Sequence, residues 1–291
     1  MDTDPLSDTV PPRYAVESDE EDEFNPLSST RDQERDHGRG PGDEATVDVK
    51  VVAPDVAGLK QKPMIVASGQ LASFWAAGAQ LGEQIGAVFV NNIQVGMLFT
   101  PGWTPAVVLI SETTTALPSR MMHPYASKVI EVLAPSSAAL LDIYPHHAYI
   151  TSSPPPFHLA PIRYLSLRSS FAPMSVERFE TPNLITSTSA AFMAILATQA
   201  PTPVTLLLLP SPRIPPPPPR ALSPSDIGMI FNTPEWSQMR MQQASDLLVH
   251  AIGDSTAGTV VLVKWKAAAE SKPPGRSARR AHIIGEGSMY I

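Results

Sequence analysis

The last three residues of the chain combine three chemical groups that one binding pocket can recognise together. Met289 offers a flexible apolar side chain, Tyr290 a phenol, and Ile291 an aliphatic side chain beside the terminal carboxylate. A pocket with an apolar wall and a lysine at its base would pair with the carboxylate, while the tyrosine ring packs and forms a hydrogen bond. Gly285 and Gly287 precede these residues, and we expect them to let the end of the chain thread into a cleft.

Signatures of catalysis and nucleotide binding are absent from the sequence. There is no GxxxxGK[ST] phosphate loop, no GxGxxG fingerprint, no GxSxG nucleophile elbow and no HExxH or HxH metal motif. There is also no Cys, which excludes disulfide bonds, thiolate ligands and a Cys nucleophile. His146 and His147 are adjacent in a predicted strand, so their rings should face opposite ways, one packed and one exposed. We expect no catalytic residue, metal or cofactor, and an α/β enzyme with an unmarked site is kept as an alternative.

A run of five prolines stands between two arginines in a Pro-rich loop predicted at about residues 210–224. Consecutive prolines favour the polyproline II helix, which aromatic grooves of SH3-type domains bind because it is already ordered. The run has the spacing of both orientations of such a ligand: Arg213 before Pro216 and Pro219, and Pro215 and Pro218 before Arg220. The other interpretation is a stiff surface loop that only separates two elements.

Residues 1–45 are predicted to be a disordered acidic tail, because a block of like charge cannot collapse into a core. Ser18 is followed by Asp19, Glu20 and Glu21, a pattern that suits phosphorylation by an acid-directed kinase. A purely solubilising tail is the simpler interpretation.

Apolar periodicity predicts strands alternating with helices from residue 47 onward. The strand-like runs are 47–52, 63–67, 87–91, 94–100, 106–111, 140–150, 162–167 and 204–209. The predicted helices are 69–84, 123–133, 183–198 and 235–252, and a last strand or helix piece is expected at 259–265. Asn183 is the expected cap of the third helix. Asn91-Asn92 should form the turn of a hairpin, and 204–209, which is apolar on both faces, should be a central strand covered by other elements on each side.

This alternation predicts an α/β fold: a single three-layer domain with a largely parallel, mixed central sheet flanked by helices. We expect the domain to cover residues 46–269 and a flexible C-terminal tail to cover 270–291. The 291 residues are 43% hydrophobic, enough to fill a core, so a wholly disordered chain is excluded.

The formal net charge of −7 is unevenly distributed. Residues 1–48 hold 15 Asp and Glu against 4 Arg, whereas residues 49–291 hold 13 Asp and Glu against 17 Lys and Arg. The folded part is thus only mildly basic, which argues against nucleic acid as a partner. The chain starts without a signal-peptide pattern and has no apolar run long enough to span a bilayer. We therefore expect a soluble protein of the cytoplasm, and also of the nucleus, with no membrane partner.

Both ends of the chain resemble one family. Met289-Tyr290-Ile291 resembles the hydrophobic-Tyr-any (HbYX) tail used by partners of the proteasome core particle. The segment from Tyr14 to Glu23, YAVESDEEDE, followed by Asn25-Pro26-Leu27, resembles the start of fungal proteasome assembly chaperone 1. An acidic start, an α/β body and this tail in one cysteine-free chain resemble that family from end to end, although the five-proline run is not part of the resemblance.

The resemblance implies a function without catalysis. Members of this family pair with a second chaperone of related fold and sit on the outer face of the seven-membered α ring of the immature 20S particle. Their terminal tripeptide enters a pocket between neighbouring α subunits, which prevents wrong association and premature regulator binding. Carried onto this chain, Met289 packs on the pocket wall, Tyr290 fixes the geometry of the tail, and the Ile291 carboxylate meets a lysine. The second hypothesis for the function is a Pro-rich scaffold that binds SH3-like domains, and the third is an α/β enzyme.

Overall fold

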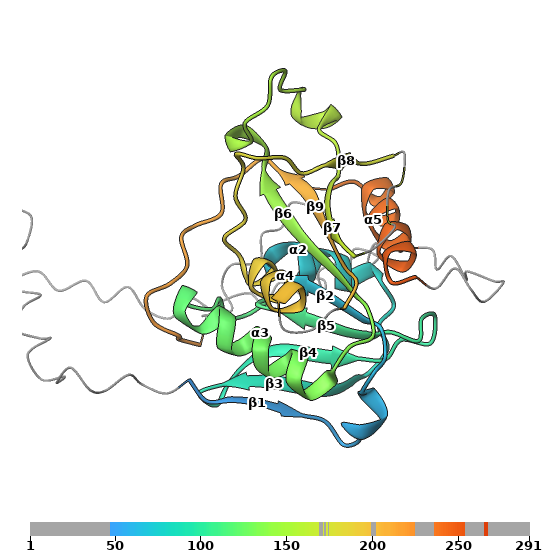
Figure 1. Ribbon diagram of the computed structural model, residues 1–291, viewed down its shortest axis with the longest axis vertical. Helices are drawn as coiled ribbons and strands as arrows, with labels where there is room; N and C mark the ends of the chain where they lie inside the picture. The colour runs from blue at the N-terminus through green and yellow to red at the C-terminus, as the bar shows by residue number, and fades with distance from the viewer. Residues whose placement is uncertain are drawn as a thin grey trace, which may run out of the picture. The chain divides into compact units, whose positions relative to one another are not determined.

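The structure is a computed structural model that describes residues 47–168, 171, 173, 175–198, 202–224, 236–253 and 265–266. This part of the chain forms one mixed sheet with the strand order β1-β3-β4-β5-β2-β6-β9-β7-β8 (Figure 1). The strands are β1 (Val49–Val52), β2 (Met64–Ser68), β3 (Gln84–Val90), β4 (Ile93–Phe99), β5 (Val107–Ser111), β6 (Ala138–Pro145), β7 (Arg163–Leu167), β8 (Glu177–Arg178) and β9 (Val204–Ser211). The helices are α2 (Gly69–Gly78), α3 (Ser119–Leu133), α4 (Thr188–Thr198) and α5 (Gln238–Ala251), with short 3₁₀ turns η3 (Ala57–Leu59), η4 (His146–Ala148) and η5 (Phe157–Leu159).

The centre of the sheet is parallel and its margins are mainly antiparallel. Strands β5, β2, β6 and β9 run in one direction, and β6 and β9 pair over their whole length, from Ala138↔Val204 to Pro145↔Ser211. Every residue of β2, β5 and β9 is buried, as a parallel strand covered on both faces requires. The predicted mixed α/β sheet is confirmed, and so is the central position of residues 204–209.

Helices cover both faces of the sheet and make three layers, as predicted. In β2, Met64 and Val66 pack into one core with α3 and α4. Ile65 and Ala67 point the other way, into a second core with α2 and α5. The alternation follows from the two-residue period of a strand. Figure 1 shows α3 and α4 together on one face of the sheet.

The predicted hairpin is formed by β3 and β4, which pair in antiparallel fashion. Its two turn residues, Asn91 and Asn92, have φ values of 48° and 64°. Such positive φ values are required at both central residues of a type I′ hairpin turn, and Asn tolerates them better than most residues do. The turn prediction is therefore confirmed.

Several predicted boundaries are wrong. Helix α3 begins at Ser119 rather than at His123, because Met121 and Met122 already belong to its buried face, and Pro124 lies inside the helix. Helix α2 ends at Gly78 and not near residue 84. Helix α4 begins at Thr188, five residues after Asn183, so Asn183 is not its cap. Strand β6 ends at Pro145, and the chain turns into η4 instead of continuing to residue 150.

Within the described residues, no helix combines the length and the apolar character that a bilayer crossing requires. The piece predicted at 259–265 lies outside the described residues except for its last one, Trp265. The predicted tails at 1–45 and 270–291 also lie outside them.

Candidate functional site

The residues for which the sequence predicts a function fall into two groups in the structure. Met289, Tyr290, Ile291 and Ser18 lie outside the described residues, so their roles stay predictions. The residues of the predicted Pro-rich ligand lie along one segment after β9, where Arg213 and Pro216 are exposed and Pro219 is half-buried. The described body adds three arrangements of polar and aromatic groups.

The first arrangement anchors the chain just before its C-terminal segment. Trp265 is 7% exposed and packs into the core shared by α2 and α5. Its indole Nε1 donates to the carbonyl of Trp75 at 2.9 Å, and its backbone N–H donates to Gln242 Oε1 at 2.6 Å. The backbone N–H of Lys266 donates to the carbonyl of Gly78 at 3.2 Å.

Gly78 is needed for this close approach. A Cβ at that position would overlap the Trp265 ring and the Lys266 carbonyl. The C-terminal segment therefore starts from a fixed point on α2. Sequence reasoning missed this anchor, for which the only signal was a lone Trp close to a segment poor in apolar residues.

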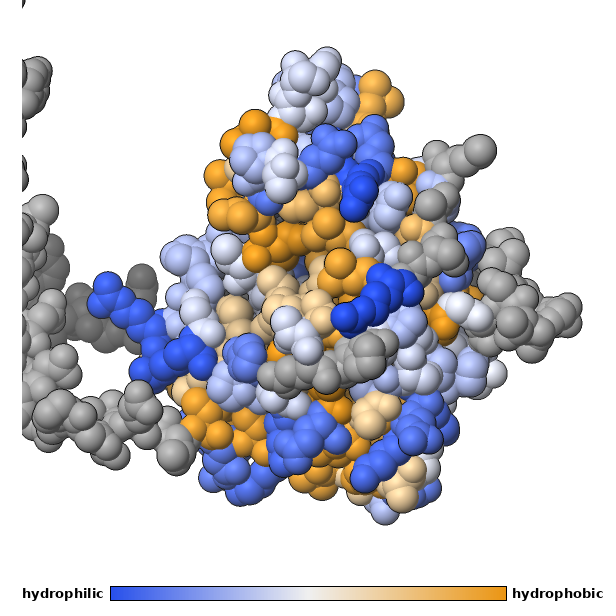
Figure 2. All heavy atoms as spheres, in the orientation of Figure 1, coloured by the Kyte–Doolittle hydropathy of each residue, from blue (hydrophilic) through white to orange (hydrophobic). Residues whose placement is uncertain are grey.

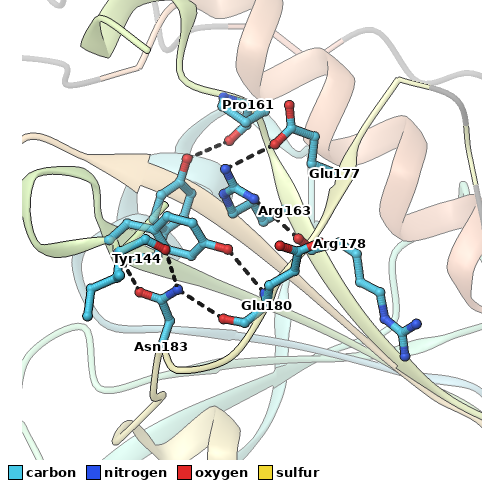
Figure 3. A network of polar contacts seen from close by, with 9 residues as sticks. Tyr144, Pro161, Arg163, Glu177, Arg178, Glu180 and Asn183 are labelled. Atoms are coloured by element: carbon cyan, nitrogen blue, oxygen red, sulfur yellow. Dashed lines mark hydrogen bonds and ion pairs between the residues drawn. The ribbon is translucent and has the colours of Figure 1, made fainter. Parts of the chain in front are cut away.

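The second arrangement is centred on Arg163, at the start of β7 (Figure 3). This residue is only 6% exposed, and its guanidinium carbon lies 3.9 Å from the ring centroid of Tyr149. Nη2 pairs with Glu177 at 3.0 Å, and Nη1 donates to the carbonyl of Arg178 at 3.2 Å. The aromatic face and these acceptors offset part of the cost of removing the cation from water, while its Nε is buried without a hydrogen-bond partner among the described residues.

Further hydrogen bonds join the two loops around Arg163. Asn183 accepts from the backbone N–H of Ile150 at 2.7 Å and donates to the carbonyl of the same residue at 3.0 Å. The backbone N–H of Glu180 donates to the Tyr149 hydroxyl at 3.1 Å. We call residues 145–150 and 177–184 the loop platform, because this network holds both segments together. The side chain of Asn183 thus joins the two loops, and α4 begins five residues later.

Tyr144, near the end of β6, packs against the loop platform. Its hydroxyl donates to the carbonyl of Pro161 at 2.8 Å, and its ring stacks edge-on against Tyr149. Burial raises the pKa of Tyr144 above its usual value, and the positive charge of Arg163 offsets part of this effect. The phenol therefore keeps its proton and its role as a donor.

Large aliphatic side chains are exposed on the loop platform. Leu184 is 85% exposed and Ile150 is 63% exposed, although the backbone on which they stand is fixed by the hydrogen bonds of Asn183. Figure 2 shows apolar residues on the upper part of this face, over the upper part of β6 and β9, and a further apolar group along its lower edge. Apolar side chains on a fixed backbone are typical of a surface that binds another protein.

The third arrangement consists of two acidic residues, Glu112 directly after β5 and Asp142 within β6. Open α/β enzymes place their sites at the carboxyl ends of such strands, which is where Glu112 lies. Asp142 accepts hydrogen bonds from Ser187 Oγ at 2.5 Å and from the backbone N–H of Ile143 at 2.7 Å. Glu112 has a φ of 56° and accepts from the backbone N–H of Leu117 at 2.8 Å. Burial raises the pKa of both carboxyls, while these hydrogen bonds hold it down in part.

In these contacts the two acids fix local structure. Ser187 directly precedes α4, so its bond to Asp142 holds the start of that helix against the sheet. Glu112 holds the turn that leads into α3 through Leu117. Among the described residues, no three His, Asp or Glu side chains come together in a way that could hold a metal ion.

The two adjacent histidines differ from the sequence prediction in one respect. They belong to η4 rather than to a strand, and their rings meet edge-on with centroids 5.3 Å apart, so they do not face opposite ways. The expected difference in burial is confirmed, because His146 is 8% exposed and His147 lies at the surface.

Comparison with known proteins gives only distant matches. No protein-family model matches the chain, and a search of curated proteins finds no significant match. Among solved structures, the fold is similar to that of Pyrococcus furiosus PbaA, an archaeal homolog of proteasome-assembly chaperone, with 13% identity and a TM-score of 0.40 over 56% of this chain and 76% of that one. It is also similar to P. furiosus PbaB, an archaeal proteasome activator, with 11% identity and a TM-score of 0.38 over 56% and 80%. A Thermoplasma acidophilum protein of unknown function matches with 10% identity and a TM-score of 0.41 over 68% and 88%.

Proposed function

We propose that this protein is a proteasome assembly chaperone. Together with a second chaperone of related fold, it binds the outer face of the 20S α ring and inserts Met289-Tyr290-Ile291 between neighbouring α subunits. In this way it promotes correct assembly of the core particle and prevents premature association, without catalysis. The observation that carries the proposal is the joint occurrence, in one cysteine-free chain, of the acidic start beginning at Tyr14 and the hydrophobic-Tyr-any end.

The anchor at Trp265 supports a role for the C-terminal segment. The 25 residues that follow Lys266 can span at most roughly 80–90 Å when extended. A body bound to the α ring keeps the tripeptide within that distance of its pocket, so a weak tail contact gains from a high effective concentration. Binding of the body and binding of the tail then strengthen each other.

The loop platform supports the second contact that the proposal requires. Ile150 and Leu184 supply an apolar centre. Arg178 and Glu180, which belong to the segment 177–184 of the platform, are exposed and charged. An apolar centre with a polar rim is the usual composition of a stable protein interface. We assign the second chaperone to this surface.

Binding of purified immature core particles tests the proposal. The full chain should bind, whereas deletion of Met289–Ile291 or the substitution Tyr290→Ala should weaken binding by about tenfold or more, because one hot-spot side chain contributes about 1.5–3 kcal/mol. Ser288→Ala, directly before the tripeptide, is the matched control and should bind as the unmodified chain does. Equal binding by all four proteins would overturn the tail mechanism.

A further inference from the structure

The Pro-rich segment after β9 is an exposed stretch of chain held at both ends. At its start, Ser211 Oγ donates to the carbonyl of Arg213 at 3.1 Å and accepts from the backbone N–H of Arg213 at 3.2 Å. At its far end, Leu222 is partly buried against the core that contains α3 and α4. Figure 1 shows the segment as an extended orange stretch along the outside of the domain.

Local sterics restrict the conformation of this stretch. The proline ring fixes φ near −65°, and the helical region is disfavoured for a residue that precedes a proline. Pro215, Pro216, Pro217 and Pro218 meet both conditions, so this stretch favours polyproline II geometry. A partner that binds this shape has little conformational entropy left to overcome.

The three residues per turn of this helix place the side chains on three ridges. The ridge of Pro215 and Pro218 is exposed, and so is the neighbouring ridge that contains Ile214 (69% exposed), Pro217 and Arg220.

The third ridge differs. Pro216 is exposed, but Pro219 is half-buried. Only the two adjacent exposed ridges are therefore open to a partner along their full length.

We propose that Ile214–Arg220 is a docking ligand for an SH3-type domain, which has an aromatic-lined groove for two proline ridges and an acidic side chain for an arginine. Pro215 and Pro218 enter the groove and Arg220 pairs with the acid. The sequence allows two orientations, and the half-burial of Pro219 selects this one over the orientation that uses Arg213, Pro216 and Pro219. This interaction is independent of the proposed action on the proteasome.

The test uses the full chain and a panel of purified SH3 domains, with binding measured by titration calorimetry. The double substitution Pro215→Ala, Pro218→Ala should reduce binding to the best domain by about tenfold or more, since it removes both side chains that enter the groove. The matched control is Pro154→Ala, Pro156→Ala in the three-proline run at 154–156, which lacks flanking arginines, and this control should leave binding unchanged.

The orientation is tested by two charge reversals. Arg220→Glu should abolish binding, whereas Arg213→Glu should change it by less than about threefold. Absence of binding to every domain of the panel overturns the proposal. Equal loss in the Pro154/Pro156 control, or loss with Arg213→Glu in place of Arg220→Glu, overturns it as well.

Discussion

The indole N–H of Trp265 donates a hydrogen bond to the carbonyl of Trp75, 190 residues earlier in the chain, at 2.9 Å. Trp75 itself is fully buried in α2, and its indole N–H donates to Ser245 Oγ of α5 at 2.9 Å. The two tryptophans thus link α2, α5 and the last described residues of the chain. The position from which the C-terminal segment departs is set by this contact.

Substitution of Gly78 tests the anchor. Gly78→Ala introduces a Cβ that overlaps the Trp265 ring and the Lys266 carbonyl, so the ring must leave its site or α2 must shift. We expect a loss of about 1–3 kcal/mol in the free energy of unfolding, measured in urea, and faster tryptic cleavage at Lys266 in the native protein.

Gly102→Ala is the control for this experiment. No atom lies within 4 Å of the Cβ that it adds, and we expect a change below about 0.5 kcal/mol with cleavage at the original rate. Similar effects of the two substitutions would show that Trp265 is not held at Gly78.

Arg163 determines the order of the loop platform. Arg163→Ala removes the guanidinium from the Tyr149 ring and leaves the carbonyl of Arg178 without its donor. We expect a loss of about 1–3 kcal/mol in the free energy of unfolding and faster amide hydrogen exchange in the loop platform, residues 145–150 and 177–184. The ion pair adds little to this figure, because the Glu177 side chain is 60% exposed.

The neighbouring substitution Arg178→Ala separates a network effect from a general loss of charge. The exposed side chain of Arg178 is removed, while its carbonyl still accepts from Arg163. Exchange rates in the loop platform should stay as in the unmodified protein. If they rise as much as in Arg163→Ala, the buried guanidinium does not hold these loops.

Asp142 makes stability depend on pH. Burial raises its folded-state pKa above the ordinary value of 3.8, so the folded protein binds more protons than the unfolded chain in the interval between the two values. The free energy of unfolding therefore falls as the pH rises from about 4 through the folded-state pKa. Asp142→Asn removes this titration and keeps the size of the side chain.

Unfolding curves in urea at several pH values between 4 and 8 give the comparison. The free energy of unfolding of Asp142→Asn, relative to the unmodified protein, should increase with pH over this interval. Glu83→Gln changes an exposed acid and is the control. Its free energy of unfolding should differ from that of the unmodified protein by the same amount at every pH. A constant difference for Asp142→Asn at all pH values would contradict the assignment.

The central sheet could be predicted from sequence because burial on both faces leaves a run whose two faces are both apolar. Val204–Leu209 is such a run, and the hairpin turn was marked by two asparagines that tolerate positive φ. These signals are local, so a single sequence contains them in full.

The interactions of the candidate site could not be predicted in this way. Arg163 and Tyr149 meet because two loops fold back on each other, and Trp265 reaches Trp75 across 190 positions. Asn183 carries the local pattern of a helix cap, but tertiary hydrogen bonds to Ile150 use its side chain instead. Contacts of this kind depend on the folded arrangement and not on the spacing of residues along the chain.

A single added glycine after Ile291 tests the proposed function most directly, because it keeps every side chain of the tripeptide and moves only the terminal carboxylate. The same glycine inserted between Gly285 and Glu286 gives a chain of equal length with the carboxylate still on Ile291. With immature core particles, the terminal addition should raise the dissociation constant by about 10–100-fold, and the internal insertion should leave it nearly unchanged. Equal dissociation constants for the two proteins would contradict capture of the carboxylate by a pocket of the α ring.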